Sequence, residues 1–109
     1  MKSPLPRRAY GQNAATYRLM AHPVRLEILN LLSQGDLTVQ ELARIIARRK
    51  ANISQHLGLL RLAGLVTAQR RNVTGSVAGP RVVYRITDRR IVDTCRILHQ
   101  LRSRHRLPF

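Results

Sequence analysis

The stretch NISQHLGLLRLAGLV, from Asn52 to Val66, decides the fold. At a helical period, Ile53, Leu57 and Leu60 lie on one face of this segment. The residues that point the other way are small or polar, namely Ala51, Asn52, Gln55 and Gly58. Gly64 predicts the end of the helix, and a β-branched run follows it. Because the polar face has no carboxylate, it can lie against a negatively charged surface.

The residues just before this helix predict a helix-turn-helix. Residues 38–41, TVQE, form a capping box in which the Thr38 hydroxyl and the Glu41 side chain each reach the other residue's backbone N–H. They start a shorter helix, and four of its residues are expected to point inward: Val39, Leu42, Ile45 and Ile46. A few residues, RRK at 48–50 among them, lead to the second, amphipathic helix, and such a pair of short helices is typical of this motif.

The flanking segments extend the pattern on both sides. Upstream, the sequence predicts one helix from Asn13, its cap, to about residue 21, and another that starts at Pro23 and ends at Gly35. Downstream, residues 65–71 begin with a strand's alternation and residues 81–87 are rich in β-forming residues, so the two segments predict a hairpin. The intervening loop, residues 72–80, is expected to be long and flexible, and Asp88 is expected to cap a last helix.

The predicted fold class is therefore mainly α with a small β-hairpin, in the order α-α-α-α-β-β-α, which is a winged helix-turn-helix. A chain of 109 residues has the size of one domain. Residues 1–12 contain Pro4, Pro6 and Gly11 and are expected to form a flexible basic arm. Residues 13–109 are expected to form the single domain.

The charge of the chain indicates an anionic partner. Twenty Lys and Arg residues stand against five Asp and Glu, a formal net charge of +15. Self-repulsion on this scale destabilises a compact chain, so a nucleic acid is favoured over the alternative of a basic surface kept for solubility. The helix-turn-helix and the wing make double-stranded DNA the expected partner. No stretch is long and apolar enough for a membrane, and the amino end does not resemble a signal peptide. A single cysteine, Cys95, excludes a disulfide framework within the chain, and a cytoplasmic location is expected.

Two groups of residues are predicted to contact DNA. Asn52 and Gln55 can pair bidentately with adenine, Arg49 or Lys50 can reach guanine, and Ser54 can serve a base or a phosphate. The start of this helix has no Ser, Thr or Asp cap, so a phosphate can satisfy its backbone N–H groups. The remaining cations lie beside that helix start or flank the wing tip, and are expected to grip the backbone: Arg48, Arg70, Arg71 and Arg81.

Alternatives stay open for the polar residues of this helix. Asn52 and Gln55 alone would fit an ordinary solvated helix face; the basic turn and the wing beside them favour DNA. His56, at the rim of the apolar face, either touches a phosphate or is a packed, hydrogen-bonded histidine.

Four segments resemble the ArsR/SmtB family of winged-helix repressors, and they occur in the family's order. They are LMAHPVRLEILNLL (19–32), DLTVQELARII (36–46), NISQHLGLLRLAGLV (52–66) and RVVYRIT (81–87). The resemblance implies a homodimer joined through the first and last helices. It also implies binding to a near-palindromic operator, occlusion of a promoter, and release on sensing a ligand.

The chain departs from the family at the positions that would sense metal. Where metal-sensing members often carry two cysteines at the start of the third helix, this chain has Thr38 and Gln40, so a thiolate site is absent there. On the last helix an Asp-x-His pair is replaced by Asp93-Thr94-Cys95. A zinc-like site remains an alternative, its candidate ligands being Asp93, Cys95, His99 and His105. The favoured interpretation is no cofactor, with Cys95 packed in an interface, and a redox role for Cys95 is the other alternative.

Three classes of function compete. The sequence favours a dimeric, sequence-specific regulator of transcription whose operator, regulated gene and signal the residues do not reveal. The second class is a nucleoid-type protein that coats DNA through charge alone. An enzyme is disfavoured because the chain has no nucleophile–base pair, no Gly-rich phosphate loop and few carboxylates.

Overall fold

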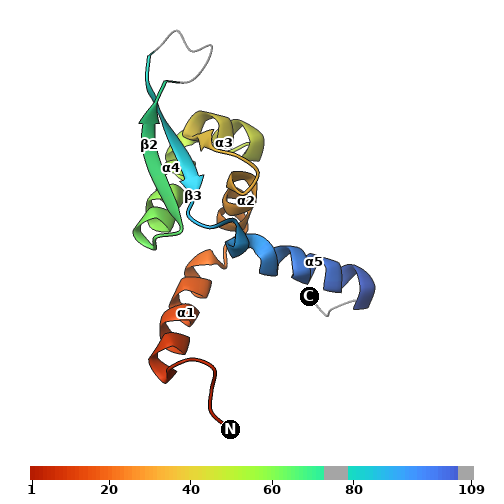
Figure 1. The fold of residues 1–109 in the computed structure, drawn as a ribbon. Coiled ribbons are helices and arrows are strands. Elements are labelled where there is room, and N and C mark those ends of the chain that lie inside the picture. The colour runs from red at the N-terminus through yellow and green to blue at the C-terminus, as the bar shows by residue number, and fades with distance from the viewer. Residues whose placement is uncertain (73–78, 106–109) are drawn as a thin grey trace.

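The computed structural model describes residues 1–72 and 79–105, the side chain of His105 excepted. Four helices come first, interrupted by a short strand: α1 (Arg7–Met20), α2 (Pro23–Leu32), β1 (Leu37–Thr38), α3 (Val39–Ile46) and α4 (Lys50–Leu62). The wing strands β2 (Val66–Arg71) and β3 (Arg81–Ile86) follow. A 3₁₀ turn, η1 (Arg89–Val92), then leads into α5 (Asp93–His105). This is the predicted mainly helical fold with a small antiparallel sheet, and Figure 1 shows the arrangement.

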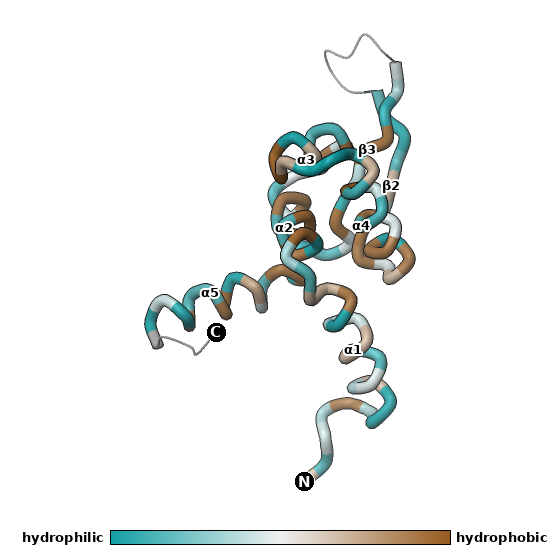
Figure 2. The backbone as a smooth tube through the Cα atoms, turned by 180° about the vertical axis from the view of Figure 1, so that it is seen from behind, coloured by the Kyte–Doolittle hydropathy of each residue, from teal (hydrophilic) through white to brown (hydrophobic). Residues whose placement is uncertain are grey.

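The core lies between α2, α3, α4 and the sheet. Its fully buried side chains include the predicted trio of α4, which is Ile53, Leu57 and Leu60. Figure 2 shows hydrophobic residues gathered along α2 and α4. The inward face predicted for α3 is wrong at Ile45, which is exposed, while Ala43 is buried in its place. An eight-residue helix places only about two turns against its neighbours, so its buried stripe is short.

Within residues 1–72 and 79–105, the sheet has three strands rather than the two of the predicted hairpin. Its order is β1-β3-β2, and both pairings are antiparallel. The short strand β1 pairs Leu37 with Tyr84 and Thr38 with Val83, so it joins the helix-turn-helix directly to the wing. Residues 73–78 of the predicted flexible wing loop lie outside the described residues.

Gly64 ends α4 as predicted. Its φ of 77° is left-handed, a conformation that glycine adopts at little cost. The Gly64 N–H donates to the Arg61 carbonyl and the Leu65 N–H donates to the Leu60 carbonyl, which together make a Schellman motif. The motif turns the chain back from α4 into β2, and it buries Leu65 against the core.

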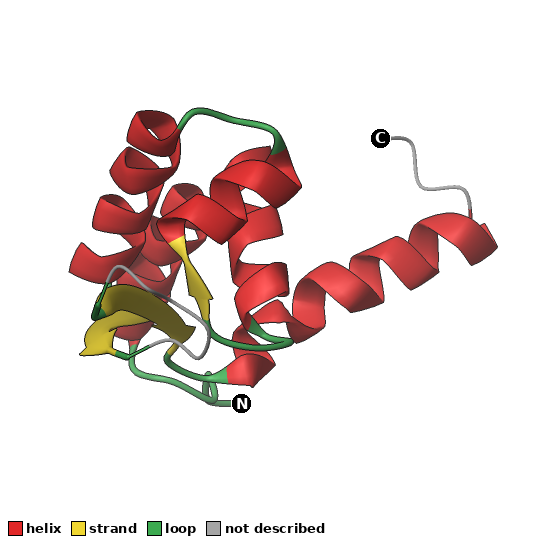
Figure 3. Ribbon diagram, turned by 90° about the horizontal axis from the view of Figure 1, so that it is seen from above, coloured by secondary structure: helices red, strands yellow, loops and turns green. Residues whose placement is uncertain are grey.

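The helices α1 and α5 leave the compact part of the molecule. In Figure 3 α5 projects to one side, and in Figure 1 α1 extends below the other helices. The radius of gyration is 16.3 Å, whereas a compact domain of this length would have about 13 Å. No residue of α1 is buried. Apolar side chains on both helices stay exposed, Tyr17, Ile97 and Leu101 among them.

Two predicted boundaries are wrong. The first helix begins at Arg7 and not at Asn13, which lies inside it, so only residues 1–6 precede it. Pro6 fits the position before the helix because its fixed φ suits a helix start. The last helix begins at Asp93, since the Asp88 side chain accepts from the Arg90 N–H and so caps η1 instead.

Candidate nucleic-acid interface

The turn between α3 and α4 is short and tightly fixed. The capping box at the start of α3 is confirmed: the Glu41 N–H donates to the Thr38 hydroxyl at 3.1 Å, and the Thr38 N–H donates to Glu41 Oε1 at 3.0 Å. At the other end of α3, Ala47 is left-handed with φ 62° and ψ 47°. The N–H groups of Ala47 and Arg48 both donate to the Ala43 carbonyl. This turn sets the direction in which α4 leaves.

The amino end of α4 is bare and basic. Arg49 occupies the cap position and its side chain makes no capping hydrogen bond, as the sequence predicted. Arg48, Arg49 and Lys50 are all exposed. A shallow hollow beside them is lined by Ile46, Ala47, Arg48, Arg49 and Asn52. Unpaired backbone N–H groups next to three cations make this end suited to an anion such as a phosphate.

The outer face of α4 presents polar side chains to solvent, but not all of those predicted. Ser54 and Gln55 are exposed. Asn52 is half-buried, and its Oδ1 atom is covered and has no hydrogen-bond partner among the described residues. Bidentate pairing with adenine needs both atoms of the amide group. In this conformation only Gln55 offers both, so Asn52 would have to rotate to read a base.

His56 belongs to the protein interior. Only 8% of it is exposed, and its Nδ1 accepts from Arg25 Nε at 3.1 Å. Burial lowers the pKa of His56, and the neighbouring His22, Arg25 and Arg48 lower it further. Of the two alternatives, the structure shows the packed, hydrogen-bonded histidine, and burial leaves the His56 side chain little surface for a phosphate contact.

The same cluster includes His22, the residue before Pro23. His22 caps α2, since its Nδ1 accepts from the Val24 N–H at 3.1 Å. Its ring lies 4.6 Å from that of His56, centroid to centroid. Pro23 follows in the first turn, as predicted.

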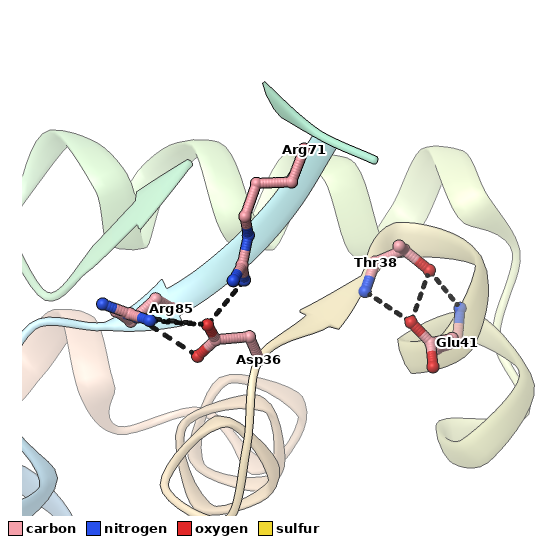
Figure 4. A network of polar contacts seen from close by, with 5 residues as sticks. All are labelled: Asp36, Thr38, Glu41, Arg71 and Arg85. Carbon is pink, nitrogen blue, oxygen red and sulfur yellow. Dashed lines mark hydrogen bonds and ion pairs between the residues drawn. The ribbon is translucent and has the colours of Figure 1, made fainter. Parts of the chain in front are cut away.

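The predicted wing cations fall into two kinds. Arg70 is exposed. Arg71 donates to Asp36 at 2.6 Å, and Arg81 donates to Gln40 at 3.2 Å. The last two are thus held by the segment that precedes and begins α3. Sequence reasoning missed Asp36 and also Arg85, which donates to Asp36 from β3 (Figure 4). The short strand β1 brings Asp36 beside the wing, and two residues gave too little pattern to predict it.

Comparison with known proteins identifies the family. Residues 22–68 match the family described as "Bacterial regulatory protein, arsR family". The chain is 34% identical over 103 residues to the HTH-type transcriptional regulator Rv0081 of Mycobacterium tuberculosis. The matched region covers 86% of this chain and 90% of that protein. The chain belongs to the arsR family of bacterial regulatory proteins. It is also 36% identical over 91 residues to the regulator NmtR of the same species, across 84% of this chain and 70% of that protein.

A solved structure agrees with this membership of the arsR family. The homodimeric winged helix-turn-helix DNA-binding domain of Mb0332 from Mycobacterium bovis matches with a TM-score of 0.73 and 28% identity, over 96% of this chain and 95% of that one. The family resemblance and the winged-helix fold are thereby confirmed. As an arsR-family protein the chain is a transcriptional regulator and not an enzyme.

Among the described residues, the last helix of this arsR-family regulator does not gather the candidate metal ligands. Asp93 accepts from Arg96 at 3.4 Å, and Cys95 is half-buried. Cys95 and His99 line a hollow between α1, α2 and α5. Within the described residues, no three His, Cys, Asp or Glu side chains approach closely enough to hold a metal ion. The side chain of His105, the fourth candidate, lies outside what the structure describes.

In the described ranges, no helix has the length and apolarity to cross a membrane.

Proposed function

We propose that this arsR-family regulator binds duplex DNA as a homodimer and represses transcription from a near-palindromic operator. The helix α4 would enter the major groove, and the wing would lie along the backbone. One observation carries the proposal. The uncapped amino end of α4 adjoins three exposed cations and an exposed, carboxylate-free polar face, while the opposite face is locked into the core. Such a regulator would act in the cytoplasm, where bacterial DNA lies.

The residues take different roles in this proposal. Gln55 and Ser54 read base edges, and Asn52 joins them after its side chain rotates. The phosphate contacts are supplied by exposed cations, Arg48, Arg49, Lys50 and Arg70. Arg71 and Arg81 would contribute less to binding the DNA backbone, because each already donates to a partner within the protein.

The exposed helices support the homodimer. Isolated helices of this length are marginally stable in water, and α1 buries none of its residues within its own chain. Half-exposed apolar residues on α1 and α5 would become buried between two copies, the principal ones being Tyr17, Ile97, Leu98 and Leu101. The homodimeric Mb0332 domain, with the same fold, supports this assembly. A two-fold dimer would prefer half-sites about 10–10.5 bp apart, centre to centre.

Selection from a random duplex library tests the proposal. The purified chain should enrich a near-palindromic duplex, and its affinity should fall by about 10³–10⁵ between 50 and 200 mM salt, given about 6–10 phosphate contacts. For each half-site, Gln55→Ala should weaken binding to the selected duplex by about 5- to 150-fold and relax the sequence preference at one position. Gln34→Ala is the matched control, an exposed amide lost outside α4 and the wing. Equal affinity for selected and random duplexes would contradict sequence-specific reading.

The formal charge of +15 supports a second candidate, a nucleoid-type protein that coats DNA. Footprinting separates the two functions. One protected palindrome supports the repressor, and continuous protection along the duplex supports the coat.

We further propose that the chain acts without a resident metal ion. The last helix carries Arg96 and Arg102 beside the candidate ligands, and such cations repel a metal. DNA affinity should therefore be the same with and without added zinc. A zinc-dependent change that Cys95→Ser abolishes would contradict this. Comparing oxidising with reducing conditions tests a redox role for Cys95 in the same assay.

A further inference from the structure

The segment from Asp36 to Gln40 holds three wing arginines at once. Asp36 Oδ2 accepts from Arg71 Nη2 at 2.6 Å, and from Arg85 Nη2 at 3.0 Å and Nε at 3.1 Å. Gln40 Oε1 accepts from Arg81 Nη1 at 3.2 Å. Figure 4 shows Arg71 and Arg85 converging on Asp36, with the capping box of Thr38 and Glu41 a few residues away. One short segment thus ties both wing strands to the start of α3.

These arginines need such a partner. The sheet register places Arg71 directly opposite Arg81, and Arg85 lies on the same face as Arg81 because alternate residues of a strand share a face. Like charges directly opposite each other destabilise a strand pair. Asp36 supplies the compensating negative charge, and it stays ionised, because the hydrogen bond from Arg85 and then that from Arg71 lower the pKa of its carboxyl group.

The other acidic residues cannot take this role. Asp88 and Asp93 pair with arginines a few residues along the chain, Arg90 and Arg96. Glu41 closes the capping box of α3, and Glu27 is exposed on α2. Of the five carboxylates in the sequence, Asp36 is therefore the one that links the helix-turn-helix to both wing strands.

We infer that Asp36 is a positioning residue for DNA recognition: it clamps the wing against the helix-turn-helix, so that the wing and α4 meet one duplex in a fixed geometry. The inference rests on the proposed function. Asp36 touches no DNA in this scheme. It acts through Arg71 and Arg85, whose side chains fix the ends of β2 and β3 relative to α3.

The direction in which DNA affinity changes when the Asp36 carboxylate is removed distinguishes positioning from simple electrostatics. Removing a carboxylate makes a cationic protein more cationic, which alone strengthens binding to every duplex. Removing the carboxylate would strengthen binding further if Asp36 merely competed with phosphates for Arg71 and Arg85. A clamp predicts the opposite for the specific duplex, because a loosened wing no longer makes its contacts together with α4. The ratio of specific to random affinity then falls.

The experiment compares Asp36→Asn with Glu27→Gln, which makes the same change of charge at an exposed site on α2. The probes are the duplex selected by the wild-type chain and a mixed-sequence duplex of equal length. Asp36→Asn should lower the affinity ratio by about 10- to 100-fold, the worth of one charge-assisted contact. Glu27→Gln should leave the ratio unchanged. An unchanged ratio in Asp36→Asn, or tighter binding to both duplexes, would overturn the inference.

A second variant guards against loss of folding. Arg85→Lys keeps the charge but loses the two-nitrogen grip on Asp36, and its exposed position protects the core. It should lower the affinity ratio in the same direction by a smaller factor, whereas Arg89→Lys, on exposed η1, should not. No change in the ratio for Arg85→Lys would count against the clamp.

Amide hydrogen exchange of the free protein tests the clamp without DNA. In Asp36→Asn and Arg85→Lys the amides of β3 near Val83 should exchange faster, while those of α4 should not change. Unaltered β3 exchange would overturn the clamp. A wild-type chain that selects no duplex would instead contradict the proposed function, and the exchange result would still decide whether Asp36 fixes the wing.

Discussion

Replacing Ala47 with glycine should stabilise the protein. Ala47 ends α3 with φ 62° and ψ 47° and is the one non-glycine residue with positive φ among the described residues. For a residue with a Cβ atom this conformation costs about 1–2 kcal/mol. Glycine removes that cost but adds about 0.4–1 kcal/mol of chain entropy to the unfolded state. Ala47 is exposed, so its methyl group contributes little packing.

Values near the middle of these two ranges leave a net stabilisation of about 0.5–1 kcal/mol in Ala47→Gly. For a domain of this size it corresponds to a rise in Tm of roughly 2–8 °C. Thermal unfolding followed by circular dichroism measures it, at one fixed protein concentration because dimers unfold in a concentration-dependent way. Backbone hydrogen bonds to the Ala43 carbonyl do not involve the side chain, so they should persist.

Ala51→Gly is the matched control for Ala47→Gly. Ala51 is also exposed, but it lies in the first turn of α4, where glycine costs up to about 0.5–1 kcal/mol. The two substitutions should therefore shift Tm in opposite directions. If Ala47→Gly lowers Tm as Ala51→Gly does, the left-handed conformation is not a source of strain and the reasoning is refuted.

Three further predictions concern stability. Gly64→Ala should destabilise the fold by about 1–2 kcal/mol in urea unfolding, because φ is 77° there, and no loss would show that the Schellman turn tolerates a Cβ atom. Thr38→Ala should cost about 0.5–2 kcal/mol through loss of the α3 cap, against at most about 0.5 kcal/mol for Thr16→Ala, a half-buried threonine that caps no helix. The pKa of His56 lies below the ordinary 6.5 when folded, so the unfolded chain binds more protons below that pH and stability should fall as pH drops from about 7.5 to 5.5. His56→Gln, which does not titrate, should lose part of this dependence, and an identical dependence would contradict the assignment.

Much of the compact part of the fold was predictable because its signals are local. The apolar spacing of Ile53, Leu57 and Leu60, the capping box at Thr38 and the glycine at 64 each act within a few residues of their own position. The β-forming residues of 81–87 likewise predict a strand, and the structure has β3 at Arg81–Ile86. Such signals do not depend on how distant segments meet, so the structure confirms them.

The errors arise where local signals are weak or compete with distant ones. The start of α1 lacks a side-chain cap, so Asn13 was the best cap in the sequence although the helix begins at Arg7. The two residues of β1 owe their extended conformation to pairing with Tyr84 and Val83, which are far along the chain. His56 has the same sequence signal whether it faces solvent or Arg25, and only the packing of α4 on α2 decides between them.

The same limit applies to the candidate site. The sequence shows how many cations there are, but not which of them face solvent and which pair with a carboxylate. Arg70 and Arg71 are neighbours in β2, yet alternation of side chains turns them to opposite faces, one toward solvent and one toward Asp36. Adjacent arginines thereby acquire different roles, one available to a phosphate and one fixing the wing. Because the chain has few carboxylates, the place of each one determines which arginines remain available to DNA. That is why a negatively charged residue, Asp36, can favour recognition of a polyanion.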